Sequence, residues 1–219
     1  MFIGHFAVAC AAKRLAPRTS LGTLFFAAQF LDLLWPWLVI AGIERLSLAP
    51  AGSVFPLVFD HYPWSHSLVM AVLWGLVVGS IYGIIRRDRR AACVVGALVL
   101  SHWFLDFLTH FPDLPLAPGA ATRFGLGLWN FPLVALAVEL TLLAGGVAFY
   151  VANTGALRAP GSWGFAGFIS ILVVIQIANV FGPPPPGPLA VAWTAMAMWV
   201  LVLWAWWCDR ARAPQRLNL

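Results

Sequence analysis

The sequence predicts an all-α membrane protein: a single domain built as a polytopic bundle of about six spanning helices, with a short N-terminal helix. Of its 219 residues, 62% are hydrophobic and only 10% are charged, whereas soluble domains carry about 25% charged residues. The mean hydropathy is +0.87. Six apolar stretches also have about the 20 residues that a helix needs to cross the hydrocarbon core.

The chain begins with an apolar segment, Met1 to Ala12, that is too short to span a bilayer. Lys13 and Arg14 follow it directly, whereas the basic residues of a signal peptide precede its apolar region. We therefore expect no cleaved signal here. The segment is expected to form a short helix that packs into the bundle from the cytoplasmic side.

The six predicted spans follow in order, at 20–43, 66–85, 91–110, 127–152, 163–182 and 188–208. The second and third are joined by the basic hairpin 86–90, and the last two by the stiff proline-rich turn 182–188, because proline cannot continue a helix. The connections 44–65 and 111–126 are longer, and long loops often cover sites.

The basic residues predict the orientation of the bundle. With the N-terminus in the cytoplasm, eleven of the thirteen Lys and Arg residues fall inside and only Arg45 and Arg123 fall outside, which matches the positive-inside rule. The predicted topology is that of a multi-pass membrane protein with both termini cytoplasmic. Because the basic residues lie at the ends of apolar runs, we expect membrane lipids as partners and no nucleic acid.

Ionisable side chains occur inside several predicted spans, where each costs about 2.5–3.5 kcal/mol on insertion scales and therefore marks a partner or a function. Asp32 lies in the first span, His102 and Asp106 in the third, and Glu139 in the fourth. At a rise of about 1.5 Å per residue, all four lie about 18 to 24 Å above the inner boundary. They can therefore form one cluster in the outer half of the bilayer.

Histidine side chains add further potential metal ligands at this depth in the bilayer. His102, Asp106 and His110 are spaced four and eight residues apart, so they share one helix face. His61 and His66 lie at the outer boundary before the second span, and His5 can approach from the N-terminal segment. Mixed imidazole and carboxylate ligation suits a divalent metal, above all Zn²⁺.

The ionisable groups are also distributed unevenly along the chain. All five histidines lie in its first half, while the last two predicted spans contain no charged residue. We therefore distinguish a polar-cluster half, residues 1–152, from an apolar scaffold half, residues 153–219.

These residues resemble a group of small inner-membrane proteins described as LexA-regulated or membrane-bound metal-dependent hydrolases. The resemblance covers about the first 115 residues and includes an N-terminal histidine (His5), an acidic residue in the next span (Asp32), a His-x4-His-Ser element (His61, His66) and a His-x3-Asp helix (His102, Asp106). The group commonly has Pro-Asp-x-Asp around the counterpart of Asp32, where this chain has a single carboxylate. It also commonly has Arg-Gly where this chain has Tyr62-Pro63.

The resemblance implies a metal-dependent hydrolase of the bacterial inner (cytoplasmic) membrane, and the depth of the predicted site favours a lipid or another amphipathic substrate. The expected metal ligands are His5, Asp32, His61, His66, His102 and Asp106, and Glu139 or Asp113 is the expected general base. Two alternatives remain open: a non-enzymatic subunit that binds a membrane-protein partner or a second copy of itself, and a proton or ion pathway along the same His and Asp residues.

Overall fold

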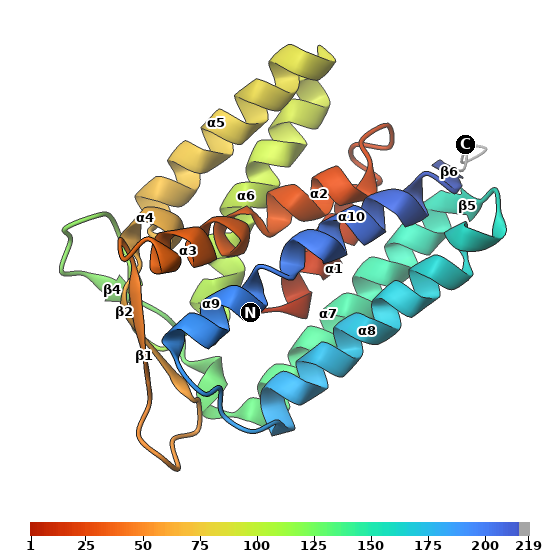
Figure 1. Ribbon diagram of the computed structural model, residues 1–219. Helices are drawn as coiled ribbons and strands as arrows, with labels where there is room; N and C mark the ends of the chain where they lie inside the picture. Colours follow the sequence, from red (N-terminus) through yellow and green to blue (C-terminus); the bar gives the residue numbers. More distant parts are fainter. Residues whose placement is uncertain (215–219) are drawn as a thin grey trace.

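The computed structural model describes residues 1–214 and is helical almost throughout (Figure 1). Its α-helices are α1 (Ile3–Ala12), α2 (Leu21–Ala28), α3 (Phe30–Ile40), α4 (Pro63–His66), α5 (Leu68–Arg86), α6 (Arg89–Thr109), α7 (Pro132–Asn153), α8 (Trp163–Phe181), α9 (Pro188–Ala195) and α10 (Met198–Asp209). Short 3-10 turns occupy Leu128–Asn130 and Ala159–Gly161.

Short antiparallel ribbons close the connections between helices. The strands are β1 (Arg45–Leu48), β2 (Leu57–His61), β3 (Leu114–Pro115), β4 (Arg123–Phe124), β5 (Thr154–Ala156) and β6 (Arg212–Pro214). They pair as β1 with β2, β3 with β4, and β5 with β6. The two long predicted loops thus each contain a ribbon.

The protein is a multi-pass membrane protein, as the sequence predicts. Five helical segments are long and apolar enough to cross a bilayer: α5, α6, α7, Ala159–Phe181 (which contains α8) and Pro188–Asp209 (which contains α9 and α10). Counting the bent pair α2 and α3 as one broken span gives up to six spans within residues 1–214. The short N-terminal helix α1 is also confirmed, and it is buried along most of its length.

The first span differs from the continuous helix expected over residues 20–43. Its two halves, α2 and α3, meet at Gln29 with a bend of 55°. The last four carbonyl groups of a helix have no intrahelical donor, so the end of α2 offers backbone acceptors inside the bundle. A broken span of this kind is tolerated in a membrane where protein surrounds the free backbone groups.

Glycines allow a close helix contact between α5 and α6. Gly75 and Gly79 on α5 face Gly96 and Ala92 on α6, and a Cβ atom added at Gly75 would lie 2.8 Å from the Gly96 carbonyl oxygen. Small residues let helix backbones approach closely in membranes, where van der Waals packing drives association.

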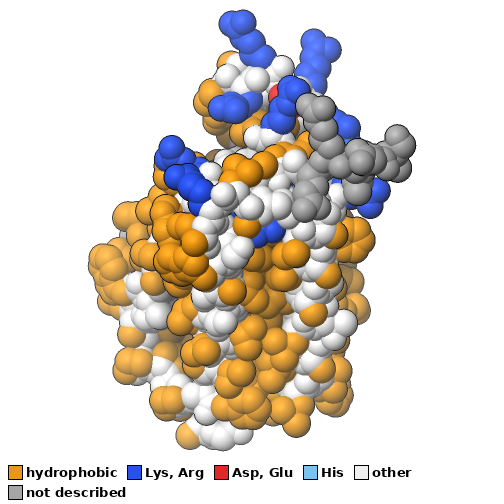
Figure 2. All heavy atoms as spheres, turned by 90° about the vertical axis from the view of Figure 1, so that its right-hand side faces the viewer, with side chains coloured by type: hydrophobic (Ala, Val, Ile, Leu, Met, Phe, Trp, Pro, Cys, Tyr) orange, Lys and Arg blue, Asp and Glu red, His pale blue; other side chains and the backbone are white. Residues whose placement is uncertain are grey.

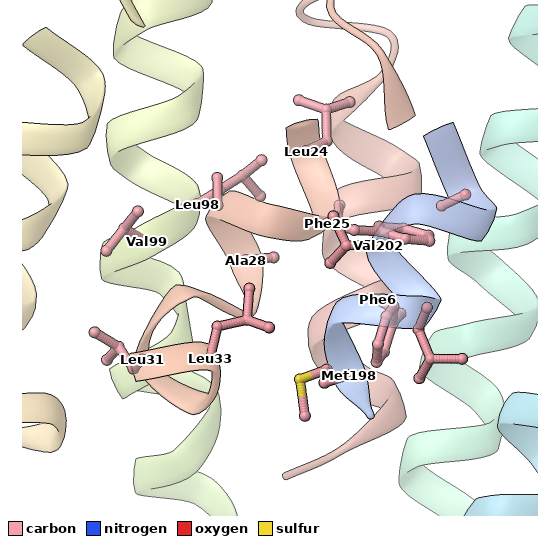
Figure 3. Close-up of a cluster of buried hydrophobic side chains, with 14 of the residues drawn as sticks. Phe6, Leu24, Phe25, Ala28, Leu31, Leu33, Leu98, Val99, Met198 and Val202 are labelled. Atoms are coloured by element: carbon pink, nitrogen blue, oxygen red, sulfur yellow. The ribbon is translucent and has the colours of Figure 1, made fainter. Parts of the chain in front are cut away.

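The apolar core lies between α1, α2, α6 and α10 (Figure 3). Phe6 on α1 packs edge-on against Phe25 on α2, with ring centroids 4.9 Å apart, and Val202 on α10 lies beside them. The outer surface is also apolar, since side chains such as Leu76 and Val200 are more than 60% exposed. Figure 2 shows this apolar surface below one end at which the Lys and Arg side chains gather, here called the basic end.

Candidate metal centre

Five of the six expected metal ligands lie together in the structure. His5 of α1, Asp32 of α3 and His102 of α6 form one group, while His66 of α4, His102 and Asp106 form another. In each group the ligand atoms lie within 4.8 Å of one another. The helix α6 contributes His102 and Asp106 one turn apart, and three other helices bring the remaining ligands to it.

The orientation of His102 is set by the break in the first span. Its Nδ1 atom lies 2.7 Å from the carbonyl oxygen of Ala28, the last residue of α2. Since a carbonyl only accepts, Nδ1 carries the proton and Nε2 presents a lone pair. That Nε2 atom is buried without a hydrogen-bond partner among residues 1–214. Metal-binding histidines are commonly fixed in this way, by donating their other N–H to a carbonyl or carboxylate.

His66 has an equivalent support. Its Nδ1 atom lies 2.7 Å from Ser65 Oγ, and Ser65 Oγ donates to Glu44 Oε2 at 2.6 Å. Because the serine proton points to Glu44, the serine oxygen accepts from His66 Nδ1, and His66 Nε2 is left to face Asp32 Oδ1 at 3.2 Å. Glu44 also accepts from the backbone N–H groups of Trp64 and Ser65, which holds it in place.

The distances between the ligand atoms fit one small cation. Tetrahedral zinc with bonds of about 2.0–2.2 Å places neighbouring ligand atoms about 3.3–3.6 Å apart. His102 Nε2 lies 3.2 Å from Asp106 Oδ2 and 3.7 Å from Asp32 Oδ1, and His66 Nε2 lies 3.8 Å from Asp106 Oδ2. The donor set and its spacing therefore suit a divalent metal held by His66, His102 and Asp106, with Asp32 facing the two imidazoles.

His5 lies on the other side of Asp106. Its Nε2 atom is 3.2 Å from Asp106 Oδ1, and its ring is stacked on that of His102, with centroids 3.7 Å apart. The Met1 amino nitrogen lies 2.6 Å from the same Asp106 oxygen. Asp106 is thus the central acceptor of the cluster.

The cluster is closed on most sides and opens at Asp32. The side chains of His5 and His102 have no exposed area, those of Asp106 and His66 have 2% and 6%, but that of Asp32 is 24% exposed. Asp32 is therefore the side through which the cluster is reached from outside.

His110 extends the cluster beyond the span, at the residue that ends α6. Its Nε2 atom lies 3.9 Å from Asp106 Oδ2, and its Nδ1 atom lies 3.0 Å from Asp113 Oδ1. Burial lowers the pKa of His110 below its usual value, an effect that the hydrogen bond to Asp113 opposes. Tyr62 donates to the same Asp113 oxygen at 2.8 Å, and burial together with this carboxylate raises the pKa of Tyr62.

The two expected bases and the remaining expected ligand lie outside the two ligand groups. The Glu139 carboxylate accepts from the backbone N–H groups of Phe2 and Gly4 and from the side-chain amide of Gln176, so it caps the start of α1. Asp113 is bound to Tyr62 and His110 as described. His61 lies on β2 opposite Arg45 and belongs to neither group.

Two supporting residues escaped the sequence analysis: Glu44, and Ser65 as a partner of His66. They lie 21 residues apart, with the β1–β2 ribbon between them, so no sequence spacing links them. The four-residue spacing from Asp106 had already placed His110 on the same helix face.

Comparison of the chain with protein-family models, with curated proteins and with solved structures finds no match.

Proposed function

We propose that this protein is a metal-dependent hydrolase of the bacterial inner membrane, with both termini in the cytoplasm. The observation that carries the proposal is the convergence of His66, His102 and Asp106, with Asp32 Oδ1 facing the Nε2 atoms of both imidazoles. Zn²⁺ suits this donor set. A zinc ion with an open coordination position supplies a nucleophile at neutral pH, because it lowers the pKa of a coordinated water to about 7.

The protein's own groups have distinct tasks in this scheme. Ala28 and the Ser65–Glu44 pair hold the two imidazoles in the ligand tautomer. The Asp32 side chain, 24% exposed, faces the entrance, where it accepts a proton or orients the substrate. Walls of apolar side chains exclude bulk water from the closed side and strengthen the electrostatic interactions there.

The depth of the site favours an amphipathic substrate. The cluster lies along α6 about 20 Å from the basic end, given a rise of about 1.5 Å per residue between Arg89 and His102. A lipid whose head group reaches this level from the outer leaflet can enter past Asp32. The proposed substrate class is therefore a lipid or another amphipathic molecule with a hydrolysable head group.

The test is hydrolysis of a panel of lipid phosphate and carboxylic esters by purified protein in lipid nanodiscs. The expected result is an activity that a chelator removes and that added Zn²⁺ restores. The double variant His102→Ala/Asp106→Ala should be inactive, while His61→Ala, with its side chain outside the cluster, should retain the activity. An activity that survives in the double variant would contradict the assignment.

A structural polar cluster is the second candidate, and the direct contact between His5 and Asp106 favours it. In that case the His and Asp side chains hold α1, α3, α4 and α6 together without a metal. The double variant would then lose stability, and zinc would not stabilise the wild-type protein.

A further inference from the structure

A second site-like feature lies at the basic end, far from the metal centre. A hollow of about 480 Å³ is lined by Arg18, Tyr82, Arg86, Arg87, Asp88 and Arg89, a size within the range of about 300–1,000 Å³ for ligand pockets. A smaller hollow of about 180 Å³ adjoins it, sharing Arg18 and Asp88 and adding Arg90. We call the two together the arginine hollow. It lies between the turn after α1 and the hairpin that joins α5 to α6.

The charge of the arginine hollow is uncompensated. It contains five guanidinium groups and one carboxylate, and Asp88 already accepts from the backbone N–H of Ala91 at the start of α6. All five arginine side chains are exposed. Within residues 1–214, none of them makes a side-chain hydrogen bond or an ion pair. Such a concentration of free, forked donors favours a phosphate-bearing anion.

The wall of the hollow is built from fixed contacts. Tyr82 on α5 is hydrogen-bonded to Thr19 through the two hydroxyl groups, at 2.9 Å. Lys13 Nζ donates to the Thr19 carbonyl at 2.8 Å and pairs with the buried carboxylate of Asp209 at 2.7 Å. The turn that carries Arg18 is therefore anchored to both α5 and α10.

Arg87 holds a backbone conformation that favours glycine. It ends α5 with φ 53° and ψ 33°, and among residues 1–214 it is the one non-glycine residue with positive φ. Glycine is the usual residue at such a helix end, because an L side chain there is strained. An arginine kept despite this strain points to a role for its guanidinium group.

Apolar side chains continue from the hollow onto the outer surface of the bundle. Ile84 and Ile85, just before Arg86, are 77% and 72% exposed, and Leu15 is 52% exposed. A soluble anion gains nothing from these side chains, whereas the acyl chains of a lipid cover them.

We propose that the arginine hollow binds the head group of an anionic phospholipid that carries two phosphates, of the cardiolipin type. One phosphate sits with Arg86, Arg87 and Arg89 in the larger hollow, and the other sits with Arg90 in the smaller one. Arg18 lies between them and contacts both. Basic pockets between membrane helices at the cytoplasmic face are suited to such head groups.

The test measures lipid binding to purified protein in phosphatidylcholine nanodiscs doped with cardiolipin, by native mass spectrometry and by the shift in melting temperature. Cardiolipin should bind and raise the melting temperature. Phosphatidylglycerol at matched phosphate concentration should bind at least about tenfold more weakly, and inorganic pyrophosphate should not compete. Each arginine near an anionic surface contributes about fivefold to affinity, so Arg18→Gln/Arg89→Gln should weaken binding by about 25-fold.

Two variants separate binding from folding. Arg87→Gly relieves the positive-φ backbone, so it should weaken cardiolipin binding by about fivefold without lowering the melting temperature of lipid-free protein. Arg158→Gln removes an equally exposed arginine outside the hollow and should bind cardiolipin like the wild type. Equal losses for Arg158→Gln and Arg87→Gly, equal binding of phosphatidylglycerol, or displacement by pyrophosphate would each overturn the two-phosphate lipid site.

Discussion

Single hydrogen bonds fix the chemistry of the histidines at the candidate metal centre. His102 and His66 donate through Nδ1, to Ala28 and Ser65, and so both turn Nε2 toward the carboxylates. Residue types and spacing were enough to predict that His5, Asp32, His66, His102 and Asp106 lie close together. They could not reveal the tautomers, because these depend on acceptors that are distant in sequence.

The hydrogen bond that orients His66 can be tested by removing the hydroxyl group of Ser65. Ser65→Ala removes the acceptor of His66 Nδ1 and frees Glu44 Oε2, so zinc affinity should fall by about 10- to 100-fold, as for other residues that orient metal ligands. Competition with a fluorescent chelator measures the change. Ser101→Ala, beside His102 on α6 but bonded only to the Leu98 carbonyl, is the matched control. Equal zinc affinity in Ser65→Ala and wild type would show that His66 is not a ligand.

Glu139 was expected as a general base, and its contacts suggest a different test. Glu139→Gln keeps an oxygen for the N–H groups of Phe2 and Gly4 but cannot take a proton. If the carboxylate only caps α1, Glu139→Gln should keep most of the hydrolytic rate. Glu139→Ala should lose about 1–3 kcal/mol of stability, because buried donors are left unpaired. A large loss of hydrolytic rate in Glu139→Gln, at unchanged stability, would instead show that Glu139 acts as the general base.

At the scale of elements, hydropathy was sufficient to locate the spans, because about 20 apolar residues are needed to cross a bilayer. It could not locate the bend between α2 and α3, since Ala27, Ala28, Gln29 and Phe30 include neither glycine nor proline. The bend arises from packing within the bundle, where the freed Ala28 carbonyl accepts a hydrogen bond from His102 Nδ1. The orientation of His102 thus depends on the bend in the first span, which the sequence does not predict.

The contact of α1 with α7 offers a paired test of packing. A Cβ atom at Gly146 would collide with the backbone carbonyl of Ala7, whereas a Cβ atom at neighbouring Gly145 meets nothing within 4 Å. Gly146→Ala should therefore destabilise the protein by about 1–3 kcal/mol through overpacking. Gly145→Ala should be neutral or slightly stabilising, since alanine favours the helix. Denaturant unfolding in detergent compares them, and equal stabilities would contradict the close approach of α1 to α7.

At the scale of the whole molecule, the polar half and the apolar half that the sequence distinguishes are hydrogen-bonded together. Asp209 at the end of α10 accepts from Lys13, from the Leu21 N–H group and from Tyr150, and Gln176 on α8 donates to Glu139. Helices of the later half therefore hold α1 and α2 in place. Composition alone could not show this, because these polar groups are few and widely spaced.

The proposed orientation is tested by thiol labelling in a background with Cys93 replaced by alanine. Arg158→Cys and Arg123→Cys place exposed thiols at the two ends of the bundle, while Cys10 and Cys208 are buried. A membrane-impermeant maleimide should label Arg123→Cys in intact spheroplasts and Arg158→Cys only in inverted vesicles. The reverse pattern would place the basic end outside the cell.

The most direct test of the metal centre is an experimental structure of zinc-loaded protein with anomalous diffraction recorded at the zinc edge. The account predicts an anomalous peak about 2.0–2.2 Å from His66 Nε2, His102 Nε2 and a carboxylate oxygen of Asp106, with Asp32 completing the site or facing its open position. A map without that peak, in which the imidazoles remain in direct contact with Asp106 and Asp32 at 3.2 Å, would contradict it.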